Sequence, residues 1–114
     1  MSCEAAPVPG RNPPDDSYQL TSSARQDVLD IYDYIAADNP DAADRFVDEL
    51  YHAFDHLVTF PRTGHPRADL AGTRPVLFWP VGAYLIIYHA HHEPLEILAV
   101  AHAARDIPTL LRHR

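Results

Sequence analysis

Four histidines interrupt two apolar runs in residues 85–106, LIIYHAHHEPLEILAVAHAARD. Imidazole nitrogens bind transition metals and transfer protons near neutral pH, so such a group could form a metal site or a catalytic site. His89 and His91 fall on one face of a predicted strand, about 6.6 Å apart by strand rise. Zinc needs a third or fourth protein ligand, but the expected cross-strand neighbours are apolar, with Ile97 opposite His89. We therefore interpret His89, His91 and His92 as the exposed tip of a hairpin, without a metal.

His102 closes the second apolar run and stands apart from the other three histidines. Pairing the two runs through a turn at residues 92–94 places His102 opposite Tyr84, or opposite Leu85 after a one-residue slip. His102 would then lie on the order of 16 Å along the strand from His89. It cannot share a metal with the other histidines.

Other catalytic arrangements are missing from the sequence. Ser22 and Ser23 lie at a predicted helix start without the glycines of a nucleophile elbow, and there is no glycine-rich phosphate loop. The chain contains no lysine, so its strong cations are all guanidiniums, which suit bidentate contacts with carboxylate or phosphate. The residues therefore indicate no recognised catalytic class.

The net charge of −7 is unevenly distributed. Residues 1–60 carry three arginines against twelve acids, and residues 61–114 carry six arginines against four acids. A protein that docks on bulk nucleic acid usually has a dominant basic face. The charge therefore argues against that function, although it is compatible with a local patch of arginines in the second half.

The length of 114 residues and the hydrophobic content of 46% predict one domain with one core. Residues 1–17 hold four prolines and no aromatic residue, so we expect a disordered arm before a single domain at residues 18–114. The single cysteine, Cys3, is typical of a reducing compartment. Without an apolar run long enough for a membrane span or a signal peptide, the expected location is the cytoplasm.

A short β-type stretch at Tyr18–Thr21 precedes a predicted helix, which a capping box of Ser23 and Gln26 would start. The apolar positions then recur at helical spacing: Ala24, Val28, Ile31, Tyr32 and Ile35. The opposite, exposed face would carry Asp27, Asp30 and Asp33.

Asn39 and Pro40 supply a cap and a first-turn proline for a second helix. Its apolar stripe is Ala43, Phe46, Val47, Leu50, Phe54, Leu57 and Val58. The tight turn between the helices predicts an antiparallel hairpin. The carboxylates on the outer face of the second helix are more typical of a solvated surface than of a cation site.

Residues 61–73 are predicted as a loop, and three strand-like runs follow: Arg74–Pro80, Tyr84–His91 and Leu95–His102. Two prolines place the first run at a sheet edge, and the hairpin of the other two places Tyr88 opposite Leu98. Asp106–Leu111 could form a short C-terminal helix. The predicted fold is α+β, in the order β-α-α-β-β-β, with the helical hairpin packed on a mostly antiparallel four-stranded sheet.

The segments YQLTSSARQDVLDIYDYIA, FPRTGHPRADLAGTR and YLIIYHAHHEPLEILAVAHAARD together resemble the ParE/RelE superfamily of type II toxin–antitoxin toxins. The resemblance covers about residues 18–112, and its motifs include Pro61-x-x-Gly64, Gly72-x-Arg74 and the closing His102-x-x-Arg105-Asp106. The family's fold is the order predicted above.

The resemblance is better to the ParE-like branch, which is associated with inhibition of DNA gyrase by binding, than to the RelE-like branch of ribosome-dependent mRNA endonucleases. Ala103 stands where the RelE-like branch typically has an arginine, and residues 103–114 contain neither tyrosine nor lysine. Ribonuclease chemistry would then fall to His102 and Arg105 alone. The leading expectation is a gyrase-binding toxin. The alternatives are the endonuclease and a toxin fold that has lost its toxicity.

The resemblance implies contacts with a target or an antitoxin on the open side of the sheet. The candidate residues are Arg67, Arg74, Tyr84, Tyr88, His102 and Arg105. Arg67 could equally form an ion pair with Asp69. For His102, a hydrogen bond within the fold is preferred over a role as a catalytic base. No cofactor is implied.

The implied partners are a cognate ParD-like antitoxin and DNA gyrase. An antitoxin segment could lie in a groove between the helical hairpin and the sheet, anchored by apolar side chains. The candidates for the floor of that groove are Val28, Tyr32, Leu50 and Phe54. If these side chains are internal, the partner binds elsewhere.

Overall fold

The computed structural model describes residues 18–91 and 94–114; the predicted arm at 1–17 lies outside them, as do His92 and Glu93 of the predicted hairpin tip. The elements in chain order are β2 (Tyr18–Leu20), α1 (Ser22–Ala36), α2 (Pro40–Thr59), α3 (Ala68–Ala71), β3 (Leu77–Val81), β4 (Tyr84–His89), β5 (Leu95–His102) and α4 (Ile107–Arg112). This order confirms the predicted one, with one difference. The predicted loop at 61–73 contains the single helical turn α3.

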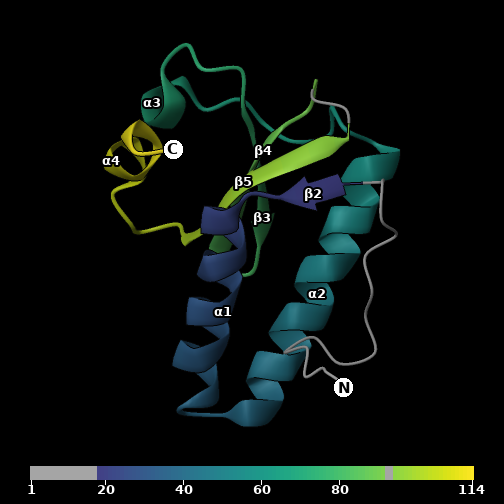
Figure 1. Ribbon diagram of the computed structural model, residues 1–114, viewed down its shortest axis with the longest axis vertical. Coiled ribbons are helices and arrows are strands. Elements are labelled where there is room, and N and C mark those ends of the chain that lie inside the picture. The colour runs from purple at the N-terminus through teal and green to yellow at the C-terminus, as the bar shows by residue number, and fades with distance from the viewer. Residues whose placement is uncertain (1–17, 92–93) are drawn as a thin grey trace.

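The strands form one four-stranded sheet in the order β2-β5-β4-β3 (Figure 1). β3 pairs with β4 and β4 with β5 in antiparallel fashion, whereas the three-residue β2 runs parallel to β5. The predicted α+β class with a mostly antiparallel sheet is therefore confirmed. β3 is an edge strand, as expected from Pro80, which has no N–H to donate to a second neighbour.

The register of the β4–β5 hairpin is partly as predicted. Tyr84 pairs with His102, but Tyr88 pairs with Ile97 and not with Leu98. An irregularity between Ile87 and Tyr88 shifts the register by one residue, as a β-bulge does. The predicted pairing of His89 with Ile97 is therefore also wrong, because Glu96 lies opposite His89.

The ends of the two long helices are set by side chains that accept backbone N–H groups. Helix α1 is capped by Thr21, whose hydroxyl accepts from the Ala24 amide at 3.0 Å, so the predicted cap at Ser23 is wrong. Thr21 has the extended backbone of a cap, and Ser23 already lies inside the helix. Asn39 caps α2 through the Ala42 amide, with Pro40 in the first turn, as predicted.

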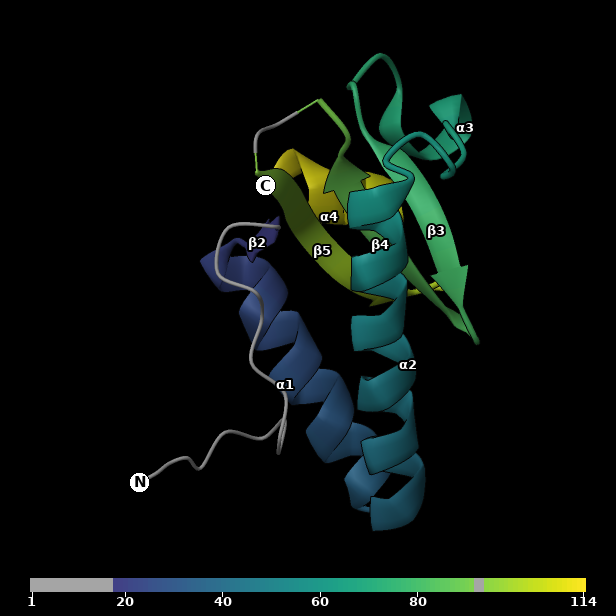
Figure 2. The same cartoon turned by 90° about the vertical axis from the view of Figure 1, so that its right-hand side faces the viewer.

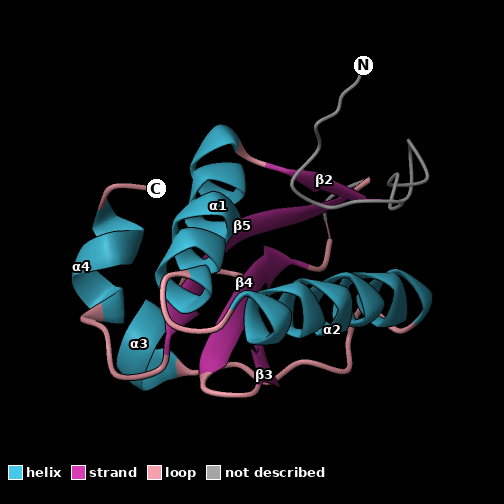
Figure 3. Ribbon diagram, turned by 90° about the horizontal axis from the view of Figure 1, so that it is seen from below, coloured by secondary structure: helices cyan, strands magenta, loops and turns pink. Residues whose placement is uncertain are grey.

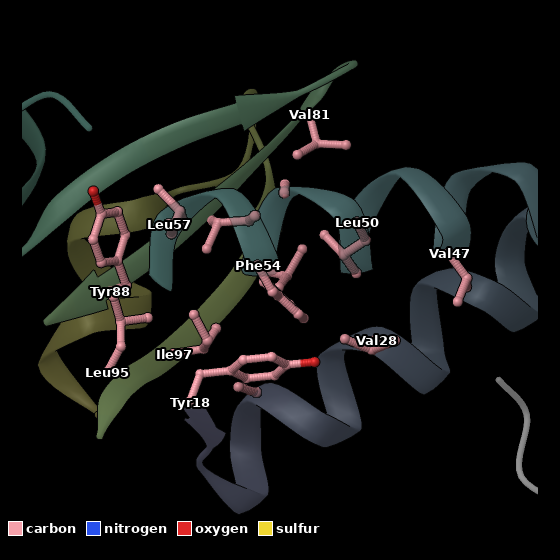
Figure 4. Close-up of a cluster of buried hydrophobic side chains, with 14 of the residues drawn as sticks. Tyr18, Val28, Val47, Leu50, Phe54, Leu57, Val81, Tyr88, Leu95 and Ile97 are labelled. Atoms are coloured by element: carbon pink, nitrogen blue, oxygen red, sulfur yellow. The ribbon is translucent and has the colours of Figure 1, made fainter. Parts of the chain in front are cut away.

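The helical hairpin packs its apolar stripe on one face of the sheet (Figure 2). Phe54 of α2 lies against Tyr18 of β2, with ring centroids 5.3 Å apart, and near Ile97 of β5 (Figure 4). Val28, Leu50 and Phe54 are all buried in this cluster. The predicted groove between hairpin and sheet is therefore wrong, because three of its four proposed floor residues are inside the core.

The other face of the sheet is covered by the two short helices. Figures 1 and 3 show α3 and α4 lying next to each other at one side of the sheet. Ile107, Leu110 and Leu111 of α4 pack against buried residues of the strands, among them Phe78 and Ile87. The expectation of an open sheet face lined by arginines is wrong for this reason. The sheet is buried on both sides.

Asp27 is buried at 8% exposure, although helical spacing places it on the predicted outer face of α1. β2 ends where Leu20 pairs with Ile97, so the outer edge of β5 continues beyond it without a strand neighbour. The Asp27 carboxylate accepts from the Val100 amide of this edge at 3.1 Å. Arg114 donates to both carboxylate oxygens, at 2.8 and 2.9 Å. An ion pair thus replaces the missing strand.

Among the described residues, no helix combines the length and the apolarity that crossing a bilayer requires.

Candidate functional site

The three predicted arginines differ in their contacts within the fold. Arg67 forms a two-bond pair with Asp69, at 3.0 and 2.8 Å, which was the alternative interpretation of this residue. The same hydrogen bond raises the pKa of Arg67 and lowers that of Asp69. Arg74 donates to the Leu111 carbonyl of α4, and Arg105 is an exposed residue of the turn after β5.

His102 and Tyr84 meet at the end of the β4–β5 hairpin. Their rings make an edge contact with centroids 5.2 Å apart, and Tyr84 also packs on Phe46 of α2 at 5.0 Å. Burial raises the pKa of Tyr84. The Nδ1 atom of His102 accepts the Ala104 amide at 3.0 Å. One ring nitrogen of His102 therefore accepts a hydrogen bond within the turn, and Arg105 is an exposed residue of the same turn.

Tyr88 is completely buried and fixes the loop after α2. Its hydroxyl donates to the Pro61 carbonyl at 2.8 Å and accepts the Gly64 amide at 3.0 Å. Burial raises the pKa of Tyr88, with partial compensation by the Gly64 N–H, so the hydroxyl stays protonated and can donate. The Pro61-x-x-Gly64 motif is thus the backbone partner of a buried tyrosine.

A second contact holds the same loop on the sheet. His65 exchanges two backbone hydrogen bonds with Phe78 of β3, at 2.8 and 2.9 Å. Gly64 lies so close to Tyr88 that a Cβ atom built on it would be 2.4 Å from the hydroxyl oxygen. Only glycine fits this position.

This fixed loop presents Arg62 at a pocket of about 270 Å³. The lining residues are Arg62, Gly64, Pro66, Arg74, Pro75, Val76, Leu77, Ala90 and His91. Arg62 Nη2 lies 3.3 Å from His91 Nδ1, and since a guanidinium only donates, the imidazole nitrogen is the acceptor. None of the described residues that line this pocket is acidic, so among them two arginines meet without a carboxylate.

A larger and less polar pocket of about 530 Å³ adjoins the first and shares Arg62 and Ala90 with it. Its remaining lining residues are Thr59, Phe60, Pro61 and Thr63. Phe60 is 57% exposed, so its ring adds an apolar surface to this pocket. We refer to the two adjoining pockets together as the Arg62 groove.

The sequence did not identify Arg62 as a site residue. The one sequence feature that could have indicated it is its position inside the Pro61-x-x-Gly64 motif. Its contact with His91 joins segments that are far apart in the sequence. Arg74 was predicted and does line the groove. Tyr88 was predicted as a binding residue, and the structure places it beneath the groove as support for the loop.

A third pocket, of about 630 Å³, lies at the far tip of the helical hairpin. Its lining residues are Tyr34, Ile35, Ala37, Asp38, Asn39 and Ala42. Tyr34 is 77% exposed there. Tyr32, which was proposed for the floor of the groove, donates its hydroxyl to Asp44 at 2.7 Å and so ties α1 to α2.

The histidines of the β4–β5 hairpin do not form a metal site within the described residues. No group of three or more histidine, cysteine, aspartate or glutamate side chains is close enough there to hold an ion. His89 instead contacts Glu96 on the neighbouring strand, with Nδ1 3.1 Å from Oε1. The imidazole of His91 faces Arg62.

Comparison with known proteins gives consistent matches. Residues 18–107 match the family described as "ParE toxin of type II toxin-antitoxin system, parDE". The protein named "Putative toxin Y4kP" from Sinorhizobium fredii is 36% identical over 78 residues, which are 68% of this chain and 78% of that protein. The fold is also similar to a chain of the structure described as "Chromosomal ParDE TA system from P. aeruginosa", with a TM-score of 0.62. That match has 19% identity and covers 76% of this chain and 95% of the other.

Proposed function

The chain belongs to the ParE family of toxins of type II toxin–antitoxin systems, and from that premise we propose that it inhibits DNA gyrase by binding and that a cognate antitoxin neutralises it. DNA gyrase works in the cytoplasm, so the proposal includes that location. Inhibition by binding requires neither a cofactor nor a covalent intermediate.

The proposal rests on the positions of the candidate catalytic residues relative to the pockets. His102 and Arg105 are the residues left for ribonuclease chemistry, and neither lines any of the three pockets described above. General acid–base catalysis requires such groups within hydrogen-bonding reach of one substrate position. The Arg62 groove, in contrast, offers cations beside an exposed apolar ring, which suits a protein partner.

An overall acidic surface supports the same conclusion. Among residues 18–60, nine carboxylates face two arginines, and the whole chain carries −7. Binding to ribosomal RNA depends on neutralising many phosphates, and a polyanion would be repelled by the helical hairpin. A protein target imposes no such requirement.

A supercoiling assay with purified gyrase, relaxed plasmid and the purified full chain tests the proposal. We expect supercoiling to fall with toxin concentration and to stop near a stoichiometric ratio, because inhibition by binding saturates with the number of gyrase molecules. The matched control is the same toxin mixed beforehand with its cognate antitoxin, which should restore supercoiling.

Full supercoiling at a stoichiometric excess of toxin, together with normal growth on induction, would contradict the proposal. Ribosome-dependent cleavage of mRNA that Arg105→Ala abolishes would replace it with the endonuclease.

A further inference from the structure

We propose that the Arg62 groove binds an acidic residue and a neighbouring apolar residue of an antitoxin segment, with the carboxylate between Arg62 and Arg74 and the apolar side chain on Phe60. The identity of the partner rests on the proposed function. The chemistry of the site rests on the groove alone.

Charge complementarity favours a carboxylate as the ligand of this groove. Arg62 donates through Nη2 to an imidazole, and Arg74 donates through Nη1 to the Leu111 carbonyl, so both of these partners are neutral acceptors. Each guanidinium carries five N–H donors, which leaves donors on both for a ligand. No described residue that lines the pocket carries a carboxylate. A carboxylate placed there would form charge-assisted hydrogen bonds with two arginines at once.

The groove is held in place by contacts within the fold before any ligand binds. The loop that carries Arg62 is held at both ends of its turn by the Tyr88 hydroxyl, and the next residue, His65, is bonded to β3. Arg74 is held by the end of α4. A site that is already ordered loses little conformational entropy when it binds a peptide.

An exposed apolar side chain lies beside the arginine pocket. Phe60 adjoins the arginine pocket through the shared residues Arg62 and Ala90, and its ring is supported by His56, with centroids 5.3 Å apart. His56 in turn stacks on Trp79 of β3 at 5.0 Å. An exposed aromatic ring that is held from behind offers an apolar side chain a fixed contact surface.

The size and surroundings of the pocket favour a peptide over a nucleic acid. A volume of about 270 Å³ accommodates one side chain, and a single carboxylate needs no extended basic surface. The acidic hairpin would repel a polyphosphate chain but leaves a short segment free to reach the groove.

The test is an NMR titration of the ¹⁵N-labelled full chain with the short peptide acetyl-Ala-Glu-Leu-Ala-amide. We expect saturable shifts of the amides of Arg62, Gly64, Val76 and His91, with a dissociation constant on the order of 1 mM, as for a ligand of few contacts. The matched peptide with glutamine in place of glutamate should bind at least about tenfold more weakly, because it cannot form charge-assisted hydrogen bonds.

Variants locate the site. Arg62→Gln keeps an exposed polar side chain and should weaken binding of the glutamate peptide by about tenfold. The control, Arg25→Gln, removes an exposed arginine from α1, on another part of the surface, and should leave binding unchanged. The spectrum of each free variant shows whether it is folded.

The proposal is overturned if both peptides bind equally, if the shifts lie at the hairpin tip around Tyr34, or if nothing binds at 10 mM peptide, a limit of about 10 times the expected constant. Inorganic phosphate forms a third arm. Phosphate that binds more tightly than the peptide and displaces it would assign the groove to phosphate ligands instead.

The outcome is separable from that of the proposed function. If the chain inhibits gyrase but does not bind the peptide, only the proposal for the groove is refuted. If the chain binds the peptide but has no effect on gyrase, only the proposal that gyrase is the target is refuted.

Discussion

Replacing Asp27 by alanine is expected to lower the free energy of unfolding by about 3–5 kcal/mol, the usual cost of removing one partner of a buried ion pair. The Asp27 and Arg114 side chains are 9% and 13% exposed, so solvent does little to screen the remaining charge. The substitution leaves the Arg114 guanidinium without its carboxylate and the Val100 amide without its acceptor. The measurement is urea unfolding followed by circular dichroism at pH 7.

A double-mutant cycle separates the pair from its surroundings. Arg114→Ala should also destabilise the protein, and the double variant should be more stable than the two single losses predict, by about 1–3 kcal/mol. The control is Asp33→Ala, an exposed aspartate of the same helix, with an expected change within about 0.5 kcal/mol. Equal effects of Asp27→Ala and Asp33→Ala would show that the ion pair does not support the edge of β5.

Replacing Gly64 by alanine is expected to destabilise the protein by about 1–3 kcal/mol, the range for forcing extra atoms into a packed site. The added Cβ would lie 2.4 Å from the Tyr88 hydroxyl oxygen and 2.9 Å from Cε1 of the same ring. Tyr88 has no free space, because it is fully buried in the sheet face that α2 covers. The loop must therefore move, and the hydrogen bonds at Gly64 and Pro61 would be lost.

Removal of the hydroxyl tests this explanation. Tyr88→Phe alone should cost about 1–3 kcal/mol, because it leaves two backbone groups unsatisfied. In the background of Tyr88→Phe, the further change Gly64→Ala should cost clearly less than in the natural chain, because the closest contact is gone. The comparison variant is Gly72→Ala, where a Cβ meets nothing and the backbone conformation, φ +62° and ψ −126°, is the source of strain. It should cost about 1–3 kcal/mol, and the same amount with or without Tyr88→Phe. A Gly64→Ala protein as stable as the natural one would contradict the close contact.

Short-range patterns account for the part of the fold that the sequence predicts. The helical spacing, the Asn39-Pro40 start and the alternating strands depend on neighbouring residues, and they led to the confirmed element order. The same reasoning placed β3 at the edge because proline cannot donate a hydrogen bond. These elements do not require knowledge of distant contacts.

Two of the wrong predictions depend on distant contacts. The helical spacing predicts that Asp27 lies on the exposed face of α1. Its burial is explained by its ion pair with Arg114, which is 87 residues away in the sequence. The bulge at Ile87 and Tyr88 moved the cross-strand partners by one position without a local sign such as glycine.

The candidate site shows the same limit. Arg74 could be singled out within a motif, but Arg62 becomes a site residue only because the loop, β3 and the end of β4 converge. The sheet face that was predicted to be exposed is covered by α4. This helix has too few apolar residues for its packing on the sheet to be predicted from the sequence.

The central claim is that this toxin acts by binding DNA gyrase and not by cutting mRNA. Pulse labelling of cells after induction of the full chain, with thymidine and leucine supplied together, tests it most directly. A gyrase inhibitor predicts that thymidine incorporation falls first and that leucine incorporation continues through the early time points. An immediate fall of leucine incorporation, with thymidine incorporation still at its initial rate, would contradict the claim.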